Sequence, residues 1–325
     1  MSTPARLTGP GPDSDGTGGP GAPGLAPRGL PRRRRLPRLL LSRPASVISL
    51  VFLALLVLMA LFAPVLTAIS GHDPYAFDED AIDPRLGGLP IGPLGGISAE
   101  HWFGVEPLNG RDIFARIAYG ARFSLSIAVL ATVLTVVIAV LLGTIAGYAG
   151  GVVDTVIGRV MDFLMAFPSL IFMIAILSAV PQANRMVMLI TVLSLFGWPQ
   201  LGRVVRAQAM SLRQREFVEA AVASGAGPFR IVFAEVIPNL SGTIIVVATL
   251  MLPQYIATEA GLSFLGVGVR PPDPSWGQMI AGAVQWSATN PMFFAIPGLF
   301  LTCTVLSCMV IGDHIQRIMA RREGI

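Results

Sequence analysis

The stretch Glu216-Phe-Val-Glu-Ala-Ala-Val-Ala-Ser-Gly225 is a polar segment, named the polar island here, between long apolar runs. It divides the apolar part of the chain and is the starting point for assigning the fold. Four of its side chains fall at positions i, i+3, i+4 and i+7 of one helical face: Phe217, Ala220, Ala221 and Ser224. Gly225 suits the left-handed residue that ends a helix, and Gly227-Pro228 suits the start of another. The pattern predicts a helix, a tight turn, a second helix and a break at Pro238.

The sequence on both sides of this island is too apolar for an ordinary soluble domain. Hydrophobic residues make up 53% of the 325 residues, and the mean hydropathy is +0.69. A run of about 20 apolar residues crosses a bilayer as a helix. The sequence therefore predicts an all-α membrane protein with six transmembrane helices, at 45–69, 123–146, 156–180, 186–205, 240–262 and 291–311.

Proline and glycine refine these helices. Pro64 is expected to kink or end the first helix near its outer end, and Gly197-Trp-Pro199 is expected to break the fourth. Gly143 and Gly147 form a small-xxx-small pair that suits close helix packing. The last five helices constitute a core over 121–317, with the loop 206–239 inside it.

Positive charge predicts the orientation. Residues 1–44 form a Gly/Pro-rich arm that is expected to be disordered, and seven arginines gather in its second half: Arg28, Arg32, Arg33, Arg34, Arg35, Arg38 and Arg43. Such a run can bind nucleic acid, but beside a first membrane helix it holds that end in the cytoplasm. The apolar run that follows exceeds the roughly 7–15 residues of a cleaved signal peptide. Arginines in 206–239 and in the tail 318–325 place the loop and both termini in the cytoplasm.

Residues 70–120 form the expected extracytoplasmic segment, which is acidic and rich in Gly and Pro. Its cluster Asp78–Asp83 could bind a cation such as Ca²⁺, but it lacks the alternating spacing and central Gly of an EF-hand loop. A solvated acidic loop is the favoured interpretation. The three histidines of the chain are scattered, and the sequence predicts no metal site and no catalytic constellation.

ATP hydrolysis by this chain is excluded on composition. All 23 basic residues are arginines, and a Walker A loop needs a lysine that reaches the phosphates. Any ATP that drives the protein must be hydrolysed on another subunit.

Four motifs resemble those of one family. Glu219-Ala220-Ala221, three residues, Gly225 and then Pro238 resemble the EAA loop of ABC importer permeases, although Glu235 replaces the isoleucine of that pattern. The other three motifs resemble C-type permeases of dipeptide and oligopeptide importers: His101-Trp-Phe-Gly104 with Gly110-Arg-Asp112, Ala166-Phe-Pro-Ser169, and Glu259-Ala-Gly-Leu-Ser-Phe-Leu-Gly266 with Pro271–Gly277. Departures occur at Val105–Asn109 and at His314.

The resemblance implies a type I importer permease fold in the bacterial cytoplasmic membrane. It implies that a coupling helix docks on an ATPase subunit through Phe217, Glu219, Ala220, Ala221, Ser224, Gly225 and Pro238. The implied partners are a second permease, two ATP-binding subunits, an extracytoplasmic solute-binding protein and membrane lipid, with no nucleic acid. This chain would bind no cofactor itself, because ATP and Mg²⁺ belong to the ATPases. The implied solutes are di- or oligopeptides, and nickel or another small solute is the alternative within the family.

Three ionisable side chains inside the predicted helices are candidates for pathway-lining or buried polar roles. Glu259 lies deep in an apolar run, where a structural hydrogen bond to a neighbouring helix is favoured over contact with solute. Arg159 and Asp162 are spaced i, i+3 near the inner mouth, which favours a pair within one helix.

A secondary carrier would need several converging carboxylates or histidines and inverted repeats, which makes that class the weaker alternative.

Overall fold

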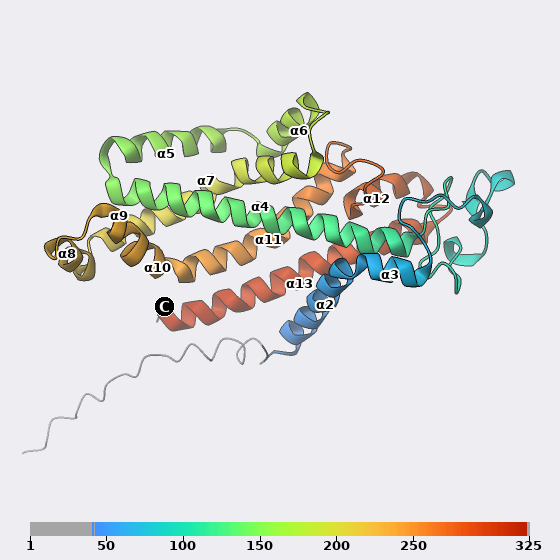
Figure 1. The fold of residues 1–325 in the computed structure, drawn as a ribbon, viewed down its shortest axis with the longest axis horizontal. Coiled ribbons are helices and arrows are strands. Elements are labelled where there is room, and N and C mark those ends of the chain that lie inside the picture. Colours follow the sequence, from blue (N-terminus) through green and yellow to red (C-terminus); the bar gives the residue numbers. More distant parts are fainter. Residues whose placement is uncertain (1–40, 42, 324–325) are drawn as a thin grey trace, which may run out of the picture. The chain divides into compact units, whose positions relative to one another are not determined.

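The computed structural model describes residue 41 and residues 43–323, so the predicted disordered arm 1–44 lies almost entirely outside the described residues. The chain is mainly helical (Figure 1). Its α-helices are α2 Pro44–Leu61, α3 Ala63–Ser70, α4 Ile113–Ala149, α5 Gly151–Ala166, α6 Ser169–Ala179, α7 Arg185–Arg213, α8 Glu216–Ala223, α9 Pro228–Arg230, α10 Ile237–Asn239, α11 Ser241–Phe264, α12 Trp276–Ala283 and α13 Pro291–Glu323.

Five of the described helices, α2, α4, α7, α11 and α13, are long and apolar enough to cross a membrane. The sixth crossing requires α5 and α6 together, and these helices are bent by 86° at their junction. The predicted crossing over 156–180 is therefore a broken span made of two helices and not a single straight helix. Phe167 is extended (φ −104°, ψ 146°) because it precedes Pro168, which disfavours helical backbone at that position.

The first crossing ends as the sequence predicts. α2 stops at Phe62, and Pro64 lies in the first turn of α3, where its missing N–H costs no helical hydrogen bond. At the other end of α2, the Ser46 hydroxyl lies 2.6 Å from His314 Nδ1 on α13. The start of α2 and the C-terminal part of α13 therefore lie at the same end of the helices.

The close packing predicted from Gly143 and Gly147 is confirmed. The two glycines of α4 face α7, where a Cβ on Gly143 would lie 2.7 Å from the Gly202 carbonyl oxygen and one on Gly147 would lie 2.8 Å from Ala209 Cβ. Residue numbers increase in the same direction along both helices, so α4 and α7 run parallel. Two long helices are thereby held together nearly backbone to backbone.

α4 begins at Ile113, ten residues before the predicted start of the second helix. The Asp112 side chain accepts a hydrogen bond from the Ala115 N–H at 2.7 Å and caps the helix. The first turns carry Arg116, which is buried, and a hydropathy argument could not count this charged residue as part of a membrane helix.

Two other predicted helix ends were wrong. α7 continues through Pro199, which is buried together with Trp198 and Leu201 of the same helix, and their burial offsets the roughly 3 kcal/mol that a proline costs inside a helix. α13 continues through Gly312, because a helical glycine costs only about 1 kcal/mol. Gly312 also lets α13 approach α11, where an added Cβ would lie 3.0 Å from Leu250 Cδ2.

Residues 71–112 cover the ends of α3 and α4 and are named the outer cap here. The outer cap contains 3-10 turns and a two-stranded antiparallel hairpin, β1 Ile82–Asp83 with β2 Leu89–Pro90. Arg116 of α4 anchors it: Nε contacts Glu106 Oε1 at 2.6 Å and Nη1 donates to the Pro74 carbonyl at 3.1 Å. The Tyr75 hydroxyl donates to Asp273 at 3.3 Å, and burial together with that carboxylate raises the pKa of Tyr75. These contacts make the outer cap part of the packed molecule.

Candidate functional site

α8 is the short helix that the polar island predicts, and it lies with α9 at the ends of α4 and α7 that are remote from the outer cap (Figure 1). Val218 is 2% exposed and anchors α8 to a core cluster, and Ala221 packs against the same cluster. Phe217, Ala220 and Ser224 are exposed. The predicted four-residue face is thus divided, with Ala221 turned inward. Three of its members remain on a surface that another protein can reach.

The turn after α8 has the geometry that the sequence predicts. Gly225 has a φ of +80°, which favours glycine. Its N–H donates to the Val222 carbonyl at 2.9 Å, and the Ala226 N–H donates to the Ala221 carbonyl at 3.0 Å. This pair of bonds is the Schellman motif, which satisfies two carbonyls at the helix end. The direction in which the chain leaves α8 is therefore fixed by local hydrogen bonds.

The second helix starts at Pro228, as predicted, but it does not break at Pro238. It continues from α9 through a π-helical turn, Ile231–Val236, into α10. The Ile237 N–H donates to the Val232 carbonyl, five residues back. Pro238 lies in the first turn of α10 just after this wide turn, where a missing N–H is tolerated.

Two aromatic side chains on this second helix were missed by the sequence analysis. Phe229 is 77% exposed and Phe233 is 45% exposed, and their ring centroids are 4.6 Å apart. Their i, i+4 spacing after Gly-Pro was the available signal. Phe217 on α8 is 38% exposed, and these three exposed aromatic side chains of the helix–turn–helix are together named the coupling surface here. Exposed aromatic side chains on one short helix–turn–helix suit contact with another protein.

A charged cluster occupies the facing sides of α5 and α7. Arg206 Nη2 donates to Asp154 Oδ2 at 2.7 Å, and Arg203 Nη2 donates to Asp162 Oδ1. Asp162 thus pairs across to α7, not with Arg159, so the predicted pair within one helix was wrong. Arg159 lines a cavity of about 210 Å³ beside these groups. The long Arg203 side chain reaches Asp162 from the neighbouring helix, a contact that spacing within α5 cannot reveal.

Glu259 is fully buried, and both carboxylate oxygens accept hydrogen bonds. Ser124 of α4 donates to Oε2 at 2.9 Å, and Ser263 of α11 donates to Oε1 at 2.7 Å. The Ser263 oxygen in turn accepts from the Val269 N–H at 3.0 Å. Glu259 therefore joins α11 to α4 and to the loop after α11. This is the arrangement of a structural hydrogen-bonding group.

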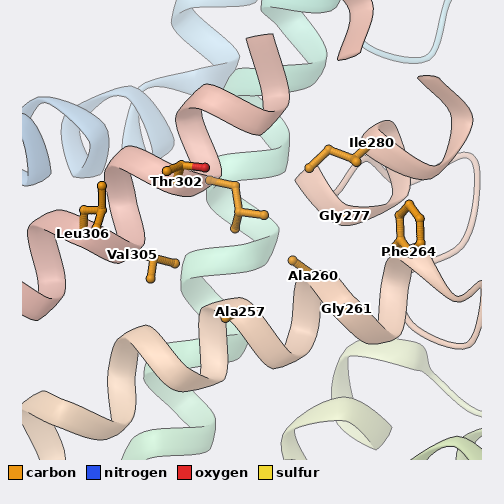
Figure 2. Close-up of a pocket in the computed structure, with 10 residues that line it drawn as sticks. Ala257, Ala260, Gly261, Phe264, Gly277, Ile280, Thr302, Val305 and Leu306 are labelled. Carbon is orange, nitrogen blue, oxygen red and sulfur yellow. The ribbon is translucent and has the colours of Figure 1, made fainter. Parts of the chain in front are cut away.

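A separate apolar cavity of about 440 Å³ lies between α11, α12 and α13 (Figure 2). Small side chains such as Ala257, Ala260 and Gly261 form one wall, and Val305 and Leu306 face them across it. Among the residues that line it, the polar side-chain atom is the Thr302 hydroxyl. A cavity with this lining cannot replace the hydration of a peptide backbone or a charged terminus. It does not suit a polar solute.

The structure thus separates the predicted site residues into three places. The residues from Phe217 to Gly225 gather at the coupling surface, with Pro238 exposed at the far end of the adjoining helix. Arg159 and Asp162 lie on α5, and Glu259 lies in the half of α11 nearer its C-terminal end. The first two places share one hydrophobic cluster, which contains Met161 of α5 and Val218 of α8.

Helical crossings of a membrane, an EAA-type helix–turn–helix and a charged face between two crossing helices together define a transport permease. The profile of the family described as "binding-protein-dependent transport system inner membrane component" matches residues 139–324. The profile described as "N-terminal TM domain of oligopeptide transport permease C" matches residues 34–86. The chain belongs to the family of binding-protein-dependent inner membrane permeases, and it is a multi-pass membrane protein whose helices fit the predicted type I importer fold.

Curated relatives agree with this assignment. The chain is 37% identical to the dipeptide transport system permease protein DppC of Alkalihalophilus pseudofirmus, over 83% of this chain and 84% of the relative. It is 34% identical to the oligopeptide transport system permease protein OppC of Bacillus subtilis, over 85% of each chain. It is 36% identical to the glutathione transport system permease protein GsiD of Salmonella typhimurium, over 82% of each chain. Among solved structures, the MetNI methionine ABC transporter matches with a TM-score of 0.49 and 19% identity, over 63% of this chain and 96% of that chain.

Proposed function

We propose that this chain is one permease subunit of an ATP-driven importer of di- or oligopeptides. The observation that carries the proposal is the coupling surface, which presents Phe217, Phe229 and Phe233 on a rigid helix–turn–helix. Two ATP-binding subunits hold ATP and Mg²⁺, and this chain contributes no catalytic group. The membership of the family and the peptide-permease relatives support a peptide as solute.

The orientation follows from the proposed docking. The coupling surface, the start of α2 and the C-terminal part of α13 belong to one end of the helices, and this end faces the cytoplasm. The outer cap then faces the binding protein that delivers the solute.

The solute path runs along the charged face of α5 and α7. The side chains of Asp162 and Arg203 are 54% and 47% exposed, and charged groups inside a membrane face water or protein and not lipid. A second permease closes this face and completes a polar pathway. The apolar cavity between α11, α12 and α13 is not part of this proposed solute path.

The experiment is peptide uptake and ATP hydrolysis by the reconstituted complex with Gly225→Pro or Glu219→Arg. Proline cannot adopt a φ of +80°, so Gly225→Pro removes the Schellman turn while the membrane helices stay intact. We expect coupled ATP hydrolysis to fall at least tenfold, with normal membrane insertion. Gly227→Ala is the matched control, because Gly227 has a φ of −71° and a Cβ there meets nothing within 4 Å.

Two alternatives are tested in the same system. Uptake of Ni²⁺ without uptake of peptides would assign the chain to the nickel branch of the family. Uptake that continues without any ATPase subunit would reject the importer proposal in favour of a secondary carrier.

A further inference from the structure

The outer cap brings together two of the histidines that are scattered in the sequence. His72 follows α3 and His101 lies in the cap, yet their rings stack with centroids 4.3 Å apart and an interplanar angle of 27°. Asp112, at the start of α4, adjoins them. One ligand atom from each of these three residues lies within 4.8 Å of those of the other two. Two imidazoles and a carboxylate are a common ligand set for zinc.

Each of the three side chains also has a hydrogen-bonding or ionic partner outside the set. His72 Nε2 donates to the Glu100 carbonyl at 3.1 Å, which leaves the Nδ1 lone pair of the neutral ring free to coordinate. Asp112 Oδ1 accepts from the Ala115 N–H at 2.7 Å, which leaves Oδ2 toward the histidines. His101 has Asp112 Oδ2 at 2.9 Å from Nδ1 and Asp78 Oδ2 at 3.5 Å from Nε2.

We propose that His72 Nδ1, His101 Nδ1 and Asp112 Oδ2 bind one divalent first-row transition-metal ion of the Zn²⁺ type. Zn–N and Zn–O bonds of about 2.0–2.2 Å at tetrahedral angles place neighbouring ligand atoms about 3.3–3.6 Å apart. His101 Nδ1 and Asp112 Oδ2 are hydrogen-bonded at 2.9 Å, so they would separate by about 0.5 Å when the ion replaces the shared proton. The ring proton of His101 then resides on Nε2 and faces Asp78. The Glu100 carbonyl, Asp78 and the Ala115 N–H are the outer partners that fix ligand orientation.

The surroundings of the cluster give a cation access. His101 lines a cavity of about 380 Å³ together with Asp78, Asp80 and Glu100, so the approach is acidic. His72 is half-buried and His101 is 7% exposed. A bound ion would link His72, which follows α3, to Asp112, the N-cap residue of α4, and would thereby close the loop of residues 72–112. Metal binding would therefore stabilise the outer cap as a unit.

The test is isothermal titration calorimetry of the full-length chain, purified in detergent and stripped with chelator. We expect one Zn²⁺ per chain and no binding of Mg²⁺. We expect His72→Gln, which keeps an amide donor for the Glu100 carbonyl, to weaken Zn²⁺ binding at least tenfold. Asp112→Asn should weaken it similarly, and because asparagine also caps helices, α4 should stay intact by circular dichroism.

Asp80→Asn is the matched control, because Asp80 lines the same cavity without belonging to the ligand set. X-ray absorption at the zinc edge should show a nitrogen and oxygen shell at about 2.0–2.1 Å. The proposal is overturned if the wild-type chain binds no Zn²⁺. It is equally overturned if His72→Gln binds Zn²⁺ as the wild type does, since the cluster is then a hydrogen-bonded structural group and the acidic loop holds the metal.

Discussion

The two ends of this permease differ in where their interacting side chains lie: those of the outer end are buried in the chain, and those of the coupling end are exposed. At the outer end, Arg116 is fully buried and contacts Glu106, the Pro74 carbonyl and the Gln278 side chain, so this buried charge is paired within the chain. At the coupling end, Val218 is the buried anchor of α8, and Phe229 is 77% exposed. The outer end buries its charged anchor within the chain, whereas the coupling end leaves aromatic side chains exposed, where the proposed ATPase subunit would bind.

The largest expected loss of stability comes from Arg116→Ala. The change leaves the buried Glu106 with Arg111 as its remaining cationic partner and removes the donors to Pro74 and Gln278. We expect the free energy of unfolding in detergent to fall by about 3 kcal/mol. Arg85→Ala, an exposed position in the same cap, should change it by less than about 0.5 kcal/mol. Equal losses for the two variants would contradict a cap anchored by Arg116.

Gly147→Ala tests the rod of α4 and α7 that joins the two ends. The added methyl group meets Ala209 Cβ at 2.8 Å, and we expect a loss of about 1–3 kcal/mol in the same unfolding assay. Gly158→Ala is the control, because a Cβ there meets nothing within 4 Å and alanine is the better helix former by about 0.5–1 kcal/mol. A neutral Gly147→Ala would show that the two helices can separate without cost.

Glu259→Gln should cost about 1 kcal/mol, because glutamine can still pair with Ser124 and Ser263. Peptide uptake by the complex should persist. Glu259→Leu removes the acceptor of both hydroxyl protons and should cost about 2 kcal/mol. Uptake lost in Glu259→Gln at unchanged stability would mean that the ionised carboxylate acts on solute or on a proton.

The smallest effect on stability belongs to the coupling surface. Phe229→Ser combined with Phe233→Ser should change the free energy of unfolding by less than about 0.5 kcal/mol, because both rings are exposed. Binding of the ATPase subunits should weaken at least tenfold in a pull-down titration. Phe77→Ser, at an exposed aromatic of the outer cap, should leave that binding unchanged. Retained ATPase binding in the double variant would place the docking contact elsewhere.

Local chemistry explains what the sequence predicted well. Gly225 has a positive φ, Pro228 fits a first helical turn, and Pro64 divides α2 from α3. Each of these residue types has a local backbone preference that can be read without knowledge of the fold. The glycine pair Gly143 and Gly147 likewise predicts close helix packing, even though the sequence does not show which helix packs there. The helix–turn–helix of the coupling end was therefore accessible from about a dozen residues.

The remaining features depend on contacts between distant residues. α7 continues through Pro199 because the side chains around it are buried, and Asp162 pairs with Arg203 because α7 lies beside α5. His72 and His101 meet only when the outer cap folds over α4. A linear pattern contains none of these distances, so helix ends, ion pairs and the histidine cluster could not be predicted.

The length of α4 has a mechanical consequence. Its 37 residues lie between the capping residues Asp112 in the outer cap and Gly150 at the coupling end, which at 1.5 Å per residue is about 55 Å of helix. A tilt of about 5° applied at one end of a helix of that length moves the other end by about 5 Å. Because α7 is clamped to α4 along the glycine contacts, both helices swing together. A small angular change at the coupling end therefore becomes a displacement of several ångströms at the outer end.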